Sequence, residues 1–329
     1  MGGYILRRLL AIPVLLLVFS VIIFALIQAP PGDFVTSYVA IIAGSGTSIT
    51  KAQIDEMRDS FGLNENLFVQ YFKWMGKIMK GDMGLSLLYM VPNSVLIKQR
   101  LGLTVLLALF SFLLSWGIAI PAGIISATHK NSFWDYFFTV INYIGVAIPN
   151  FFLALLLMWL AFSWWGMSLV GLFSNEFVNA PWSWARVVDL LKHLWLPSLV
   201  IALGGSARLT RVMRANLLDE LGKPYMITGR AKGMSEWALV MKYPVRLALN
   251  PLISTIGNYI PQLFSGSLIV ATVMNLQNIG PLLLQALQTQ DMYLSGAILM
   301  VYCLLSIVGT ILSDILLAMV DPRIRMENN

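Results

Sequence analysis

The chain has 329 residues, of which 58% are hydrophobic and only 12% are charged, and its formal net charge is +6. Soluble domains average about 45–50% apolar and 25% charged residues, so a soluble fold could not bury this much apolar surface. The composition therefore indicates an integral membrane protein. One cysteine, Cys303, excludes an internal disulfide and a cysteine-based zinc site, and two histidines are too few for a histidine-rich metal centre.

Several uncharged stretches are long enough to cross the hydrocarbon core, which takes about 20 helical residues. In chain order they are 9–29, 101–128, 136–175, 247–290 and 292–313. The stretch 136–175 has room for one long helix and a loop rich in Trp and Phe. The stretch 247–290 is interrupted by proline, so it predicts one span followed by a re-entrant or outer segment.

A further span is predicted from a shorter uncharged stretch, 194–207, which gives about 21 Å of helix. Arg208, Arg211 and Arg214 follow it at spacings of three residues. This pattern predicts a helix that leaves the membrane and continues into the cytosol with one basic face. The sequence thus predicts an all-α integral membrane protein with six transmembrane helices.

The distribution of Lys and Arg predicts the orientation of these spans. With the N-terminus inside, the inner segments carry thirteen Lys and Arg residues and the two short outer loops carry two. Short cytoplasmic loops are enriched in these residues, so both termini are expected to be cytoplasmic. A signal peptide is the alternative for the first span, but its 21 apolar residues exceed the 7–15 that are usual there.

The spans divide the chain into three parts: the N-terminus and first span (1–29), an extracytoplasmic segment (30–100), and a five-helix core (101–329). In the second part, apolar residues recur at helical spacing between Leu67 and Met79, and Lys73, Lys77 and Lys80 lie at other positions. This pattern predicts an amphipathic helix. Two roles stay open for it: packing across the outer ends of the spans, or forming part of a docking surface for an external partner.

The core contains a cytoplasmic loop, 210–246, with strong helix punctuation. Pro224 suits the first turn of a helix, Gly233 suits a left-handed position after its end, and Ser235 suits the N-cap of another helix. A helix of about two turns is therefore expected to present Tyr225, Thr228, Arg230 and Lys232 to the cytosol. Because two turns are marginal alone in water, this helix favours a protein-docking knob over a mere orientation signal.

Catalytic signatures are missing from the sequence. It contains no G-x-x-x-x-G-K-[ST] phosphate loop, no H-E-x-x-H and no G-x-S-x-G. We therefore expect no enzymatic activity, and no nucleotide, metal or other cofactor bound by this chain itself.

Neutral polar residues recur beside prolines in the predicted spans. They are Asn142, Tyr143 and Asn150 in the third span and Asn258, Tyr259 and Gln262 in the fifth. Irregular backbone at membrane depth is tolerated where it lines a cavity, so these residues are candidates for a translocation pathway. Helix–helix packing through polar side chains is the equal alternative.

Five motifs occur together in an order that resembles one family over nearly the whole chain. They are Tyr4-Ile5-Leu6-Arg7-Arg8-Leu9-Leu10, Gly81-Asp82-Met83-Gly84, Arg208-Leu209-Thr210-Arg211, Gly229-Arg230-Ala231-Lys232-Gly233 and Asp321-Pro322-Arg323. The chain resembles the permease subunits of bacterial ABC importers in the dipeptide/oligopeptide/nickel family, specifically the member with a long segment after the first span.

The resemblance implies the type I ABC importer permease fold and assigns a coupling role to the cytoplasmic loop. In that family an E-A-A…G segment fits a groove on the ATPase subunit; here Ile227, Thr228 and Gly229 occupy the first three positions and Gly233 is retained. The residues expected to couple to the ATPase are Tyr225, Thr228, Arg230, Ala231, Lys232 and Gly233.

The resemblance also implies partners and a solute. The partners are a homologous second permease chain, two ATP-binding subunits that bind ATP and Mg²⁺, an extracytoplasmic solute-binding protein and membrane lipid; nucleic acid is not expected. The location is a bacterial or archaeal plasma (inner) membrane. Oligopeptide is the expected solute. Ala271 stands where the family often has an acidic residue, which keeps neutral oligosaccharide as the alternative, and a secondary transporter is a more distant one.

Overall fold

The computed structural model describes residues 2–44, 49–256 and 268–320. The regular secondary structure of these residues is helical. One isolated antiparallel bridge joins Leu85 and Pro92. Four of the described helices are long and apolar enough to cross a membrane, and a bent pair raises the number to as many as five. The prediction of an all-α membrane protein is confirmed for this part of the chain.

The chain forms two compact units, and two long helices contribute to both. One unit comprises Val105–Gln277 and the residues from Ser306 onward, and the other comprises Gly2–Thr104 and Asn278–Leu305. The shared helices are α5 (Asn93–Thr128) and α14 (Met292–Val320). We refer to the unit with Val105–Gln277 as the core unit and to the other as the N-terminal unit.

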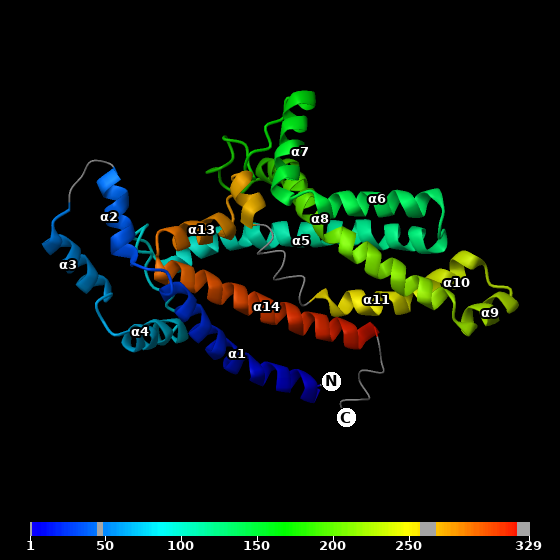
Figure 1. The fold of residues 1–329 in the computed structure, drawn as a ribbon, viewed down its shortest axis with the longest axis horizontal. Coiled ribbons are helices and arrows are strands. Elements are labelled where there is room, and N and C mark those ends of the chain that lie inside the picture. Colours follow the sequence, from blue (N-terminus) through cyan, green and yellow to red (C-terminus); the bar gives the residue numbers. More distant parts are fainter. Residues whose placement is uncertain (1, 45–48, 257–267, 321–329) are drawn as a thin grey trace. The chain divides into compact units, whose positions relative to one another are not determined.

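Helix α8 (Trp184–Leu221) is the centre of the core unit, where α6, α7 and α11 pack against it (Figure 1). It is continuous over 38 residues, which confirms the prediction that the fourth span extends through the arginines after residue 207. Helix α5 also approaches it closely, because a Cβ atom at Gly123 would lie 2.7 Å from Cβ of Met213. Near its start, Asp189 accepts hydrogen bonds from the backbone N–H and hydroxyl of Ser174, at 2.8 and 2.6 Å.

The prediction of a single long helix in 136–175 is wrong. Two helices, α6 (Phe133–Ala147) and α7 (Asn150–Trp165), occupy this part of the chain. Their axes differ by 104° at a break between them. The cause is Pro149, which lacks an N–H group, together with Ile148 before it, whose backbone is extended (φ −87°, ψ 123°). The chain therefore turns at the residues that the sequence marks as irregular.

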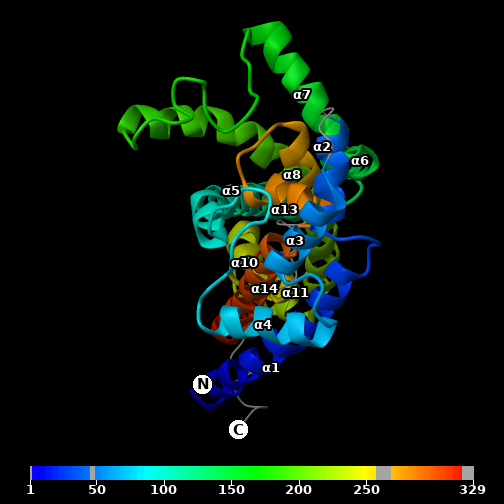
Figure 2. The same cartoon turned by 90° about the vertical axis from the view of Figure 1, so that its left-hand side faces the viewer.

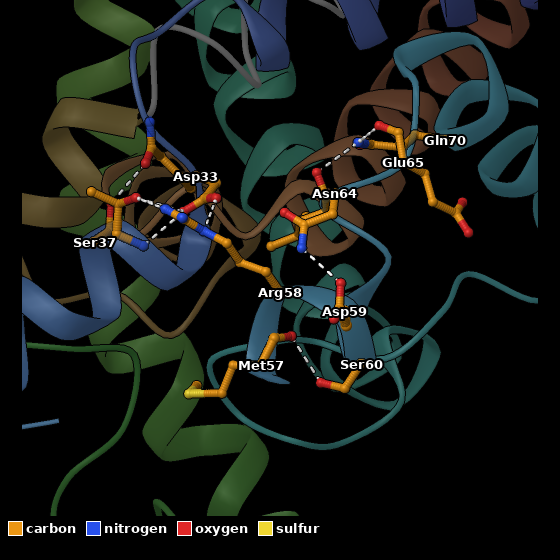
Figure 3. Close-up of polar contacts among 12 residues, drawn as sticks. Asp33, Ser37, Met57, Arg58, Asp59, Ser60, Asn64, Glu65 and Gln70 are labelled. Atoms are coloured by element: carbon orange, nitrogen blue, oxygen red, sulfur yellow. Dashed lines mark hydrogen bonds and ion pairs between the residues drawn. The ribbon is translucent and has the colours of Figure 1, made fainter. Parts of the chain in front are cut away.

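Polar contacts hold the first helices of the N-terminal unit together. Helix α2 (Phe34–Gly44) packs against α3 (Lys51–Phe61), and Arg58 Nε donates to Asp33 Oδ2 at 2.9 Å (Figure 3). Burial alone would raise the pKa of Asp33, but hydrogen bonds from Thr36 and Arg58 and the charge of Arg58 hold that pKa below its usual value. The carboxylate thus stays ionised and fixes the start of α2 to α3.

A buried carboxylate organises the rest of the N-terminal unit. Asp291 lies between α13 (Ile279–Gln288) and the first residue of α14. Its side chain accepts hydrogen bonds from the Ser86 hydroxyl at 2.6 Å and from the N–H of Leu294 at 3.1 Å.

Helix α4 (Leu67–Met79) confirms the predicted amphipathic helix. It lies beside α1 (Gly2–Gln28) in both views (Figure 1 and Figure 2). Asp291 and residues of α14 thus contact segments of the chain that precede them by some two hundred residues or more within this unit.

The predicted fifth span is described only in part. Helix α11 (Pro244–Ser254) precedes it, and residues 257–267 lie outside the described residues.

The close approach of α5 to α8 generates a test of the core unit. We expect Gly123→Ala to lower the free energy of unfolding by about 1–3 kcal/mol, because its Cβ would overlap Met213 and come within 3.1 Å of the Thr210 carbonyl oxygen. Thermal unfolding in detergent measures the effect. Gly117→Ala on the same helix is the control, since no atom lies within 4 Å of its Cβ position, and equal stability of the two variants would contradict this packing.

Candidate functional site

The predicted two-turn helix exists as α9 (Pro224–Ala231). Pro224 occupies its first turn, where the missing N–H costs nothing. Gly233 follows in the left-handed conformation (φ +75°) and its N–H donates to the Arg230 carbonyl at 2.9 Å. Helix α10 (Glu236–Lys242) then begins after Ser235, which stands at the N-cap without a hydrogen bond from its side chain. The helix punctuation of the sequence is confirmed.

One face of α9 is buried against its neighbours. Met226 is fully buried, and a Cβ atom added at Gly229 would overlap the side chain of Leu239 on α10, which is also fully buried. Glycine is thus required at position 229 for the close approach of the two helices. This packing explains how a helix of eight residues persists.

Tyr225 takes part in this support and is only partly exposed to solvent. Its side chain is half-buried, and its hydroxyl donates to Glu220 Oε2 near the end of α8 at 2.7 Å. Burial and the negative charge of Glu220 raise the pKa of Tyr225 above its usual value, so the phenol keeps its proton. The residue ties α9 to the helix that precedes it.

Five of the predicted coupling residues are exposed: Thr228, Arg230 and Ala231 on α9, and Lys232 and Gly233 in the turn that follows it. Arg230 Nε donates to Glu236 Oε1 at 2.6 Å, which raises the pKa of Arg230 and lowers that of Glu236. Both side chains are well exposed, so this ion pair contributes little to stability. It fixes the geometry of the turn between α9 and α10.

Two large apolar side chains on this surface were not among the predicted coupling residues. Ile227 is 67% exposed on α9 and Trp237 is 66% exposed on α10. Exposed aromatic and aliphatic side chains at a helical knob are typical of a protein interface. We call the exposed residues Ile227, Thr228, Ala231 and Trp237 the knob surface.

An ion pair between the buried Asp135 and the half-buried Arg214 joins α6 to α8 upstream of the knob surface. Arg214 donates from Nε to Asp135 Oδ1 and from Nη2 to Asp135 Oδ2, both at 2.7 Å, and Asp135 is 3% exposed. The hydroxyl of Ser126 on α5 and the N–H of Asn131 also donate to Asp135. The sequence analysis placed Arg214 on a basic face but missed Asp135, whose position three residues after the helix-capping Ser132 was the available signal.

The candidate pathway residues occupy different helices. Asn142 is half-buried and Tyr143 is 62% exposed on α6, whereas Asn150 begins α7 beyond the bend. The side chain of Asn150 lies against Gly204 of α8, where an added Cβ would be 2.8 Å from Asn150 Oδ1. That close approach places Asn150 at a contact between α7 and α8, and its role in a pathway stays a prediction. Asn258, Tyr259 and Gln262 lie outside the described residues.

Among the described residues, no group of three or more His, Cys, Asp or Glu side chains is placed to hold a metal ion. The core unit brings together a short helix that is buried on one face and the Asp135–Arg214 ion pair, which we call the charged link.

Comparisons with known proteins identify the family of this chain. Residues 119–326 match the family described as the binding-protein-dependent transport system inner membrane component, and residues 1–88 match the family described as the N-terminal part of a binding-protein-dependent transport system membrane component. Both ends of the chain therefore carry family features.

Named relatives match over almost the whole length. The chain is 36% identical over 329 residues to the oligopeptide transport system permease protein AppB of Bacillus subtilis, covering 98% of this chain and 99% of that protein. It is 35% identical over 325 residues to a putative peptide permease protein of Brucella suis (98% and 99% covered) and 31% identical over 363 residues to the inner membrane ABC transporter permease protein YejB of Escherichia coli O157:H7 (99% and 100% covered). The chain therefore belongs to the family of inner membrane components of binding-protein-dependent transport systems, the permeases of ABC importers.

Proposed function

We propose that this chain is one of two permease subunits of an ATP-driven importer of oligopeptides. It pairs with a homologous second permease chain, two cytoplasmic ATP-binding subunits and an extracytoplasmic solute-binding protein in a bacterial or archaeal plasma membrane. Relatives whose names state oligopeptide or peptide transport support the solute class. Neutral oligosaccharide is the alternative solute, favoured by the buried, uncharged Ala271.

The proposed topology has six transmembrane helices with both termini in the cytoplasm, as in type I importers. The proposal counts the four long helices and the bent pair as five spans. The remaining one is the span that the sequence predicts within 247–290, where residues 257–267 lie outside the described residues. The first span lies in 1–29, the segment 30–100 is extracytoplasmic, and 101–329 forms the core with its cytoplasmic loop 210–246. The excess of Lys and Arg in the inner segments supports this orientation.

The observation that carries the coupling proposal is the architecture of α9. A helix of eight residues is held on one face by Met226, Gly229 and Leu239 and leaves the knob surface uncovered in this chain. The ATP-binding subunits are proposed to cover the knob surface and to bind ATP and Mg²⁺, since this sequence has no phosphate loop. Their closure would shift α9 and bias the spans between outward-facing and inward-facing states.

The proposal assigns the charged link a transmission role. Arg214 lies two turns before the end of α8, which leads through Gly222 and Lys223 into α9. Asp135 connects that part of α8 to α6 and, through Ser126, to α5. A displacement of α9 and α8 would thus reach the neighbouring spans through a strong, directional contact.

Gly233 provides a direct test of coupling. We expect Gly233→Val to lower ATP-dependent solute uptake by roughly tenfold, because a β-branched residue in the left-handed conformation costs about 1–2 kcal/mol and distorts the turn after α9. Uptake and ATP hydrolysis are measured in proteoliposomes that contain the complete complex. ATP hydrolysis is expected to continue, poorly linked to uptake.

Gly233→Asn is the matched control, because Asn tolerates positive φ and should retain most of the uptake. No atom lies within 4 Å of the Cβ position, so a steric clash does not confuse the comparison. Unchanged uptake in the Val variant would contradict the coupling role. Uptake driven by an ion gradient without ATP would instead identify a secondary transporter.

The charged link is tested by Asp135→Asn. The substitution removes the charge that faces Arg214, and we expect a loss of about 1.5–3 kcal/mol in the free energy of unfolding together with reduced uptake per ATP hydrolysed. Thermal unfolding and the uptake assay measure the two effects separately. Arg211→Ala, at an exposed position on the same helix, serves as the control, and equal behaviour of both variants would disprove the role of the pair.

A further inference from the structure

Helix α4 in the N-terminal unit has three distinct faces. The buried face carries Gln70 and Trp74, the latter in a cluster with Ile23 of α1 and Met300 of α14. A second, exposed stripe carries Phe68, Phe72 and Met79, and a third carries Lys73 and Lys77, followed by Lys80 at the C-cap. The helix therefore exposes an apolar stripe although its other side is already buried.

The contacts of the buried face place α4 beside the apolar part of α1 and not beyond its end. Gln28, the last residue of α1, donates to Gln70 Oε1 at 3.1 Å, whereas Ser20, eight residues earlier, is 2.9 Å from the Tyr71 hydroxyl. Eight residues correspond to about 12 Å along a helix. The 19-residue stretch Leu10–Gln28 is long enough to span most of the hydrocarbon core, so these contacts lie inside it.

Contacts with α14 give the same level independently. Trp74 packs on Met300 and fits against Gly296, where an added Cβ would be 2.8 Å from its ring. These residues lie four and eight positions after Met292, the start of α14, or roughly 6–12 Å along the helix. Amphipathic helices that lie in a membrane interface bury their apolar face about 5–10 Å below its boundary.

The exposed stripe of α4 is made of large apolar side chains, and α1 exposes apolar side chains at the same level. Phe68, Phe72 and Met79 are 76%, 69% and 78% exposed. Exposed apolar side chains on α1 at the same level include Val18, Val21 and Ile22. Lys73 pairs with Glu65 at 2.5 Å and Lys77 lies 5.3 Å from the ring centre of Tyr293, so these two ammonium groups stay on the polar side of the stripe.

We propose that α4 is an interfacial helix whose exposed stripe is covered by phospholipid. Acyl chains contact Phe68, Phe72 and Met79, and the lysine stripe meets the phosphate groups of the same leaflet, as basic residues of amphipathic helices do. Assignment of this leaflet to the outer side of the membrane rests on the proposed topology; burial of α4 in lipid does not. A soluble partner protein is the competing occupant.

The test uses nitroxide side chains in the full chain, assembled with its partners in phospholipid liposomes. On a Cys303→Ala background, single cysteines replace Phe68, Phe72 or Met79, and electron paramagnetic resonance compares collisions with oxygen, which concentrates in lipid, and with a water-soluble nickel chelate. Val21 is the lipid control and Glu56, exposed on α3, is the water control.

We expect the oxygen-to-nickel collision ratio at all three positions to match Val21 and to exceed that at Glu56 several-fold. Ratios equal to that at Glu56 would overturn the proposal. It would also be overturned if the label at position 72 becomes protected from nickel only after the solute-binding protein is added, since the occupant would then be a protein.

A second variant separates the position of α4 from the properties of a single label. Gly296→Val fills the space that Trp74 occupies and should lower the collision ratio at position 72 toward the water control, while position 21 stays unchanged. No change at position 72 would show that contact with α14 does not set the depth of α4, which contradicts the argument.

Discussion

The absence of water from the hydrocarbon core is the constraint on which this structure depends. Backbone polar groups there must be satisfied within the protein, so the apolar stretches form helices, and a break needs compensation. The one marked break in the described spans, between α6 and α7, occurs at Pro149, and the first residue after it, Asn150, lies against Gly204 of α8. Outside the membrane, the nearly buried charge of Asp135 is matched by Arg214 through paired hydrogen bonds.

These requirements connect the fold to the proposed function. A transporter needs elements that move as units, and helix α8 with its close contacts to α5, α6, α7 and α11 forms such an element in the core unit. Helix α9 gains its order from α8 and α10 and leaves its other face for a partner. In the proposed function the exposed face of α9 is the docking surface, α8 connects it to the spans, and the energy source is in another subunit.

The sequence predicts local features well because their causes are local. Pro224 and Gly233 mark the two ends of α9, and the apolar spacing in 67–79 marks α4. The basic residues Arg208, Arg211 and Arg214 continue the helical spacing of the stretch before them, which marks the long α8. The bend at Pro149 was not predicted, since a proline in an apolar stretch allows either a kinked helix or two helices and tertiary contacts decide between them. Asp135 pairs with Arg214, 79 residues away, and the half-buried Tyr225 donates to Glu220. Both contacts depend on packing that one sequence does not reveal. The roles of the pathway residues stay predictions.

The length of α8 has a mechanical consequence. Its 38 residues extend over about 57 Å, well beyond the roughly 30 Å of hydrocarbon that it crosses. It is anchored near its first turns by Asp189 and near its last turns by Arg214. Because the helix is fastened near both ends, its two ends do not move independently of their neighbours: a displacement near Arg214 is carried along the rod toward the elements around Asp189. The core unit is thereby linked mechanically over a length greater than the thickness of the hydrocarbon layer.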